Sequence, residues 1–133
     1  MNVVIDSDIL IYFLKGQQEI VDKLSAHPIE NIFTTRINVT ELLYGAFNSA
    51  KVAQNMAKIS AFLANFHILE FDEKASMTFA QEKARLKKNG DLIADMDLMI
   101  ASITVANGFA LVSNNLKHFD RISGLAVERW LEK

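Results

Sequence analysis

The sequence has 133 residues, half of them hydrophobic, with one proline, five glycines and no cysteine. This length indicates a single domain over residues 1–133, and the lack of cysteine excludes disulfides and cysteine-bound zinc. The net charge of −2 excludes a polycation, so any binding to nucleic acid must depend on a local basic patch. No basic segment precedes the first apolar run, so we expect no signal peptide and a cytoplasmic location.

The first half of the chain alternates short strands with helices. Residues 3–5 form a continuous apolar strand that ends at Asp6, and Gly16 closes the helix that follows. The expected elements up to residue 64 are a strand over 3–5, helices over 9–14 and 19–25, a strand over 32–36, a helix beginning at Asn38 and a helix over 52–64.

The second half contains the most apolar helix. A strand over 67–71 and a helix over 73–89, capped by Asp72, lead to a stretch with no charged residue between Asp97 and Lys117. A helix that is apolar nearly all round is a buried helix, and we expect it to end at Gly108 before a strand over 109–112. Polar residues interrupt this stretch before about 20 residues, too early for a membrane span. The tail, 125–130, is expected to add a short strand and an aromatic plug at its end.

This alternation of strands and helices predicts an α/β fold with a central, mostly parallel sheet flanked by helices on both faces. Ligands of such folds bind at the carboxyl ends of the strands. Four polar residues fall at or just beyond those ends: Asp6, Glu41, Asp97 and Asn115. Three carboxylates at one edge would raise one another's pKa unless a cation lay among them, and oxygen ligands favour Mg²⁺ or Mn²⁺. The pattern therefore favours metal-assisted hydrolysis, in which the cation activates water and neutralises a phosphate.

Each acid could also stabilise a helix end without belonging to a site. Glu41 follows Asn38 by three residues, as in a capping box at a helix start. Asp95 and Asp97 both fall in the first turn of the buried helix, where acids complement the dipole, and Asp95 is expected to be the cap. After the first strand, Asp8 could cap the next helix. The joint occurrence of the acids favours a site.

Other polar residues carry weaker signals. Arg85, Lys87 and Lys88 end a helix, where cations complement the dipole, although Arg85 and Lys88 could also bind RNA. Arg36 could bind phosphate or neutralise a carboxylate. The three histidines, at positions 27, 67 and 118, show no ligand spacing and are expected to be surface or strand residues.

Blocks of sequence along nearly the whole chain resemble one family. The opening Val4-Ile5-Asp6-Ser7-Asp8 resembles that of PIN-domain ribonucleases. Three further blocks resemble the VapC toxins of toxin–antitoxin pairs, namely Thr40-Glu41-Leu42-Leu43-Tyr44-Gly45, Met96-Asp97-Leu98-Met99-Ile100-Ala101 and Leu111-Val112-Ser113-Asn114-Asn115. The tail over 122–130 is also similar to theirs.

This resemblance implies an Mg²⁺-dependent endoribonuclease, with Mn²⁺ as a substitute, that hydrolyses tRNA or mRNA with metal-activated water and arrests translation. It further implies a VapB-like antitoxin and a homodimer. The family's metal-binding and catalytic acids map onto Asp6, Glu41 and Asp97. Asn115 stands where many members carry an acid and would complete the site. The residues expected to orient ligands around it are Ser7, Asp95 and Ser113.

Two alternatives remain at this stage. A receiver domain of signalling proteins would use Asp6 and Asp8 as its acidic pair and Asp72 as its phosphoacceptor, but the expected lysine is missing after the strand over 109–112. An RNA-binding module with a dead site would explain the amide at Asn115. RNA cleavage by the wild-type protein would exclude the second alternative.

Overall fold

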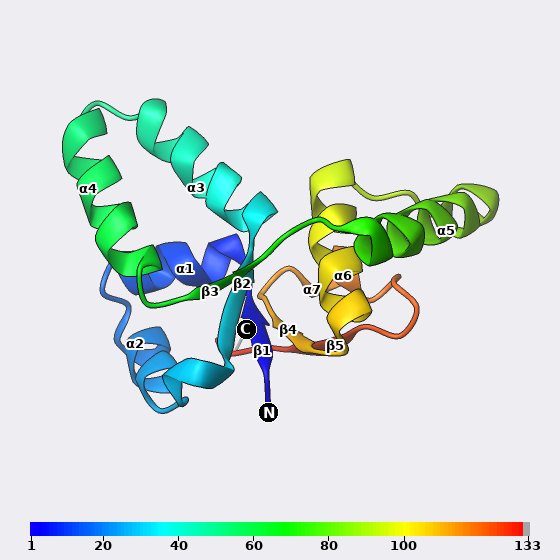
Figure 1. Cartoon of the computed structure of the whole chain (residues 1–133), viewed down its shortest axis with the longest axis horizontal. Helices are drawn as coiled ribbons and strands as arrows, with labels where there is room; N and C mark the ends of the chain where they lie inside the picture. Colours follow the sequence, from blue (N-terminus) through cyan, green and yellow to red (C-terminus); the bar gives the residue numbers. More distant parts are fainter. Residues whose placement is uncertain (132–133) are drawn as a thin grey trace.

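The computed structural model describes residues 1–131, which form one sheet surrounded by helices (Figure 1). The strands are β1 (Val3–Ile5), β2 (Ile32–Thr35), β3 (His67–Leu69), β4 (Ala110–Val112) and β5 (Ala126–Glu128). The helices are α1 (Ser7–Leu14), α2 (Gln18–Ser25), η1 (Ile29–Asn31), α3 (Arg36–Phe47), α4 (Val52–Leu63), α5 (Glu73–Asn89), α6 (Asp95–Asn107) and α7 (Leu116–Phe119). Every strand pairing in this part of the chain is parallel, so the predicted α/β architecture is confirmed.

Helices cover both faces of the sheet, because successive side chains of a strand point to opposite faces and those of β1 are apolar on both. Val3 and Ile5 of β1 pack into a core with α1, α2, α3 and α4, whereas Val4 packs into a second core with α5, α6 and α7. Figure 1 shows these two groups of helices on opposite sides of the sheet. Strands β1 and β4 are buried throughout, as expected for strands covered on both faces.

The strand order, β3-β2-β1-β4-β5, creates a switch point between β1 and β4. The chain places β2 and β3 on one side of β1 and then returns to the other side for β4 and β5. Ligands of open α/β sheets bind outside the carboxyl ends of the strands at such a point. Receiver domains of the CheY type have the order 2-1-3-4-5, which this chain does not share.

Register places the ends of three strands together. Ile5 pairs with Val112, so Asp6 and Ser113 leave β1 and β4 side by side. The hydroxyl of Thr34 in β2 donates to the carbonyl oxygen of Ile5 at 2.8 Å. The residues that follow β1, β2 and β4 therefore meet at one edge of the sheet.

The main error in the predicted boundaries is at α3. The sequence predicted a strand to residue 36 and a helix from Asn38, whereas the helix begins at Arg36. Thr35 is the N-cap, its hydroxyl accepts from the backbone N–H of Asn38, and the Asn38 side chain accepts from the backbone N–H of Thr35. Glu41 is therefore not the second member of a capping box, and that interpretation is wrong.

Smaller differences concern element ends. The predicted strand over 67–71 ends at Leu69, and α7 was not predicted. Asp72 caps α5 as expected, with its carboxylate accepting from the backbone N–H of Ala75 at 2.9 Å. The predicted aromatic plug is also confirmed, because Trp130 is buried against the core on the α1–α4 side.

Helix α6 is buried as predicted over its central residues, including Leu98, Ile100 and Ile103. Two hydroxyls in this segment are satisfied within the helix, since Ser102 and Thr104 donate to the carbonyl oxygens four residues earlier. Gly108 ends the helix with φ +71°, a left-handed conformation that glycine adopts without strain. Over residues 1–131, no helix has both the length and the apolar character needed to cross a membrane.

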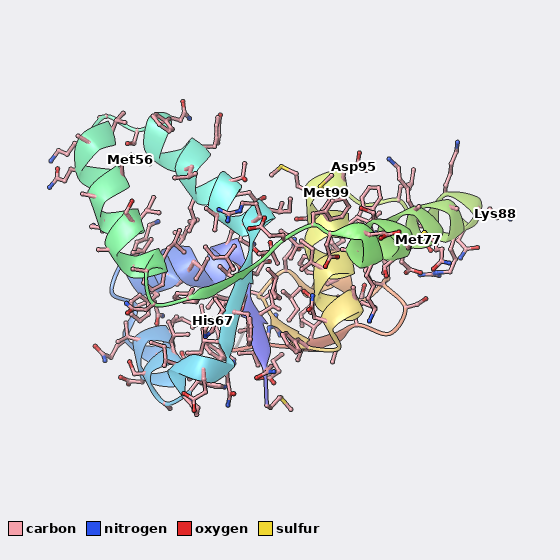
Figure 2. All side chains as sticks on the ribbon, in the orientation of Figure 1. Met56, His67, Met77, Lys88, Asp95 and Met99 are labelled. Carbon is pink, nitrogen blue, oxygen red and sulfur yellow. The ribbon has the colours of Figure 1, made fainter. Side chains whose placement is uncertain are left out.

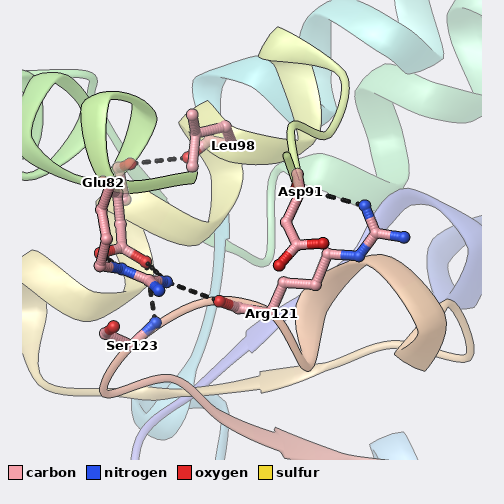
Figure 3. Close-up of polar contacts among 7 residues, drawn as sticks. Glu82, Asp91, Leu98, Arg121 and Ser123 are labelled. Carbon is pink, nitrogen blue, oxygen red and sulfur yellow. Dashed lines mark hydrogen bonds and ion pairs between the residues drawn. The ribbon is translucent and has the colours of Figure 1, made fainter. Parts of the chain in front are cut away.

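A polar cluster around Glu82 joins α5 to the segment after α7 (Figure 3). The buried Glu82 carboxylate accepts two hydrogen bonds from Arg85, at 2.7 and 3.0 Å, and one from the backbone N–H of Ser123 at 2.9 Å. Arg85 also donates to the backbone carbonyl of Arg121, and the Arg121 guanidinium donates to the carbonyls of Asp91 and Leu92. These contacts connect the segments that lead into α6 and out of α7.

Replacing Glu82 by glutamine should lower the free energy of unfolding by about 1–2 kcal/mol at pH 7. The hydrogen bonds from Arg85 are the main cause of a lowered pKa of Glu82 in the folded protein. A lowered folded-state pKa gives stability that is present above the unfolded pKa and is lost as the pH falls through the folded pKa. Urea denaturation of both proteins between pH 7 and pH 3 should therefore show a difference that shrinks on acidification. A difference independent of pH would contradict this.

Candidate active site

Asp6 is the buried centre of the polar edge. It is the N-cap of α1, and its Oδ1 accepts from the backbone N–H of Ser7 at 2.8 Å and from Asn38 Nδ2 at 2.9 Å. Its Oδ2 accepts from the Ser113 hydroxyl, which follows β4, at 2.8 Å. The backbone of Ser7 and the side chains of Asn38 in α3 and Ser113 after β4 therefore fix this carboxylate.

Glu41 joins the same network from the second turn of α3. The Ser7 hydroxyl donates to Glu41 Oε1 at 2.5 Å and accepts from Asn38 Nδ2 at 2.8 Å. Ser7 and Asn38 thus connect the Asp6 and Glu41 carboxylates. Glu41 also lines a cavity of about 390 Å³ between α1, α3 and α4.

Asp97 lies in the first turn of α6, which packs on the opposite face of the sheet from α3. Its side chain is 22% exposed. Its Oδ2 is 3.3 Å from Nδ1 of His118 in α7. The same ring nitrogen is 3.3 Å from Nδ2 of Asn115. The backbone N–H of Asn115 donates to the Ser113 hydroxyl, which connects this group to Asp6.

The acids influence one another electrostatically. Burial is the main cause of a raised pKa at Asp6, which three hydrogen bonds oppose and the charge of Asp97 increases. Burial likewise raises the pKa of Glu41, with added repulsion from Asp6 and Asp97. Burial and the charge of Asp6 raise the pKa of Asp8 to about 6. Negative charge is therefore held at this edge at an energetic cost, which a bound cation would remove.

The donor set at this edge fits a hard divalent cation. Among residues 1–131, no three His, Cys, Asp or Glu side chains form a ready-made metal-binding cluster. Mg²⁺ does not require one, because it retains several waters and is usually held by one or two carboxylates. Glu41 in α3, Asp97 in α6 and Asp6 at the end of β1 supply carboxylate oxygens of the kind that such a cation binds.

Other predicted site residues lie outside this network. Asp95 begins α6 (Figure 2) but is not its cap, since Ala94 holds that position. Its carboxylate instead accepts from Lys83 at 2.9 Å. The prediction that Asp95 caps the helix is wrong. Arg36 is exposed and forms an ion pair with Glu70 at 2.6 Å. Arg85 is held by Glu82, whereas Lys88 is exposed near the C-terminal end of α5 (Figure 2).

Sequence reasoning missed three members of the network. Asn38 was assigned to a helix start, Asp8 to a possible cap, and His118 to the surface or a strand. Asp8 is partly buried and its Oδ2 accepts from the backbone N–H of Asn114 at 2.9 Å. A signal for His118 was available, because a residue three positions after Asn115 shares its face if the segment is helical.

The chain is similar to known proteins over nearly its whole length. A family model described as PIN domain matches residues 3–125. Ribonuclease VapC2 of Haemophilus influenzae is 35% identical over 98% of this chain and 99% of its own length. The tRNA(fMet)-specific endonuclease VapC of Salmonella typhimurium is 28% identical, with 98% of both chains covered.

Solved structures show the same fold. VapBC2 from Rickettsia felis, bound to a DNA fragment from its promoter, contains a chain that is 30% identical, with a TM-score of 0.91 over 98% of this chain and all of that one. DNA-bound VapBC from Salmonella typhimurium gives a TM-score of 0.93 at 27% identity, covering 98% of this chain and 99% of that one.

The parallel sheet with acids at its carboxyl edge is thus that of a PIN-type nuclease domain. The chain belongs to the PIN-domain family and, within it, to the VapC ribonucleases of toxin–antitoxin systems. The predicted family and fold are confirmed. Neither the receiver domain nor the inactive RNA-binding module is favoured.

Proposed function

We propose that this chain is an Mg²⁺-dependent endoribonuclease that acts as the toxin of a toxin–antitoxin pair. One observation carries the proposal. Asp6, Glu41 and Asp97 come from three separate elements and lie at the switch point of the sheet, where the charges of Asp6 and Asp97 raise the pKa of neighbouring carboxyls. Repulsion among carboxylates does not stabilise a fold, whereas carboxylates placed this close together can bind a cation.

The proposed roles follow from the contacts. Asp6, Glu41 and Asp97 would hold Mg²⁺ or Mn²⁺, which when bound would activate water and neutralise charge on the scissile phosphate. Ser113 and Ser7 hold Asp6 and Glu41 in place through the hydrogen bonds that they donate. Asn115 would complete the site without adding a charge. The expected products carry a 5′-phosphate and a 3′-hydroxyl.

The substrate and partners are proposed from the relatives. We expect the chain to cleave tRNA or mRNA in the cytoplasm, since one VapC relative is named as a tRNA(fMet)-specific endonuclease. The structures named VapBC support a VapB-like antitoxin as its partner. We further propose a homodimer whose exposed cations, including Lys88 and Arg36, contact RNA phosphates.

Removal of divalent cations should abolish cleavage. Purified protein incubated with total cellular RNA should give discrete cuts with Mg²⁺ or Mn²⁺ and none with a chelator, and added Mg²⁺ should restore them. The cation should also raise the melting temperature, because it relieves repulsion among the acids. Cleavage that persists in chelator would argue against the metal-dependent mechanism.

A further inference from the structure

Nδ1 of His118 lies close to two groups that require opposite hydrogen-bond roles of it. Its Nδ1 lies 3.3 Å from a carboxylate oxygen of Asp97 and 3.3 Å from the amide nitrogen of Asn115. A carboxylate can only accept a hydrogen bond, and an amide NH₂ group can only donate one. One ring nitrogen cannot donate to Asp97 and accept from Asn115 at the same time.

The charged partner decides the arrangement. Hydrogen bonds to an ionised acceptor are about twice as strong as those between neutral groups, so Nδ1 carries the hydrogen and donates to Asp97. Rotating the Asn115 side-chain amide by 180° then places its Oδ1 next to His118 and its NH₂ group on the side away from the imidazole ring. This exchange of the two amide atoms leaves every other contact in place.

We propose that His118 is a positioning residue of the nuclease site. Its Nδ1–H holds Oδ2 of Asp97, so that Oδ1 would be available to a cation, and it turns the NH₂ group of Asn115 away from the ring, where that group would donate to an RNA phosphate. Asn115 thus contributes a neutral donor where a metal-binding acid would otherwise stand. This inference rests on the proposed nuclease function.

The surroundings of His118 support such a role. Phe119, the next residue, is fully buried in the core on the α5–α7 side, which anchors the short helix α7. Asn115, at the N-cap of that helix, is tied through Ser113 to Asp6. The imidazole is therefore carried by a fixed element, although its side chain is 42% exposed.

The tautomer can be measured directly. Long-range ¹H–¹⁵N correlation spectra of labelled, metal-free protein distinguish the two ring nitrogens of each histidine, and the signals of His118 are those missing from His118→Asn. We expect the Nδ1 of His118 to carry hydrogen when the ring is neutral. A neutral ring protonated only at Nε2 would overturn the proposal.

Metal affinity gives a second, independent readout. His118→Asn places an amide donor near the position of Nδ1 and should bind Mn²⁺, followed by water-proton relaxation, within about threefold of wild type. His118→Leu lacks the donor and should bind Mn²⁺ about 10- to 100-fold more weakly. Circular dichroism and thermal melting check that both variants fold. Equal Mn²⁺ affinity in His118→Leu and wild type would overturn the proposal.

The role of Asn115 is tested with RNA in the presence of chelator. Asn115→Asp replaces the donor by a charged acceptor and should weaken RNA binding about tenfold. Asn65→Asp makes the same change just before β3, at the opposite edge of the sheet, and should have little effect. Equal effects of the two substitutions would contradict the assigned orientation.

Failure of this inference differs from failure of the proposed function. If wild type cleaves RNA but His118→Leu matches it in Mn²⁺ affinity, only the role of His118 is wrong. If wild type cleaves no RNA with any divalent cation, the proposed function is wrong, and the tautomer still reports whether His118 holds Asp97.

Discussion

Asp97→Asn should reduce the rate of RNA cleavage by at least about 100-fold while the protein remains folded. Charge stabilisation by a divalent cation contributes several kcal/mol to the transition state, and about 1.4 kcal/mol corresponds to a tenfold change in rate. Asp97 does not cap α6, and within residues 1–131 its side chain makes one polar contact, with His118 at 3.3 Å. Its loss should therefore affect chemistry far more than folding.

A control for this substitution lies two residues away. Asp95→Asn makes the same chemical change in the first turn of α6 but removes only the exposed ion pair with Lys83. Its cleavage rate should stay within about twofold of wild type, since exposed ion pairs contribute little. Labelled RNA resolved on denaturing gels, with Mg²⁺ and with chelator, provides the measurement. Equal losses in both variants would place the active site elsewhere.

The same pair of variants tests the electrostatic origin of the site. Without a cation, Asp97 repels Asp6 and Glu41. The metal-free Asp97→Asn protein should therefore melt at a temperature equal to or above that of wild type, and Mg²⁺ should stabilise it less. A marked loss of stability in Asp97→Asn would show that the carboxylate supports the fold instead.

Asn38→Ala should lower the free energy of unfolding by about 2–4 kcal/mol and also impair cleavage. The side chain is fully buried, donates to Asp6 and Ser7, and accepts from the backbone and hydroxyl of Thr35. Each buried group left without a partner costs about 1–3 kcal/mol. The change keeps the Thr35 cap but removes the reciprocal half of the capping box, together with a donor to the buried Asp6 carboxylate.

Asn55→Ala is the matched control for Asn38→Ala. Asn55 lies in α4, is partly buried and makes one side-chain hydrogen bond, to the Ser49 hydroxyl. Its replacement should cost less than about 1 kcal/mol. Urea denaturation of the three proteins at pH 7 gives both values. Similar values for the two variants would mean that the Asn38 network adds nothing beyond one ordinary hydrogen bond.

The sequence by itself determined the sheet, the buried helix and the acids at its edge. Apolar runs such as 3–5 and 98–106 leave few alternatives to buried strands and helices, because exposing them to water would be too costly. Strand direction then follows from the alternation with helices, and it brings the residues after each strand to one edge. Asp6, Glu41 and Asp97 could therefore be grouped from their positions alone.

Only the tertiary structure decided which polar groups touch. Thr35 rather than Asn38 caps α3, because the register of β2 ends the strand there and buries the Thr35–Asn38 pair. His118 meets Asp97 across 21 positions of sequence, and Ser113 meets Asp6 across 107. Hydrogen bonds act over about 3 Å and depend on the packing of whole elements, so spacing along the chain does not encode them.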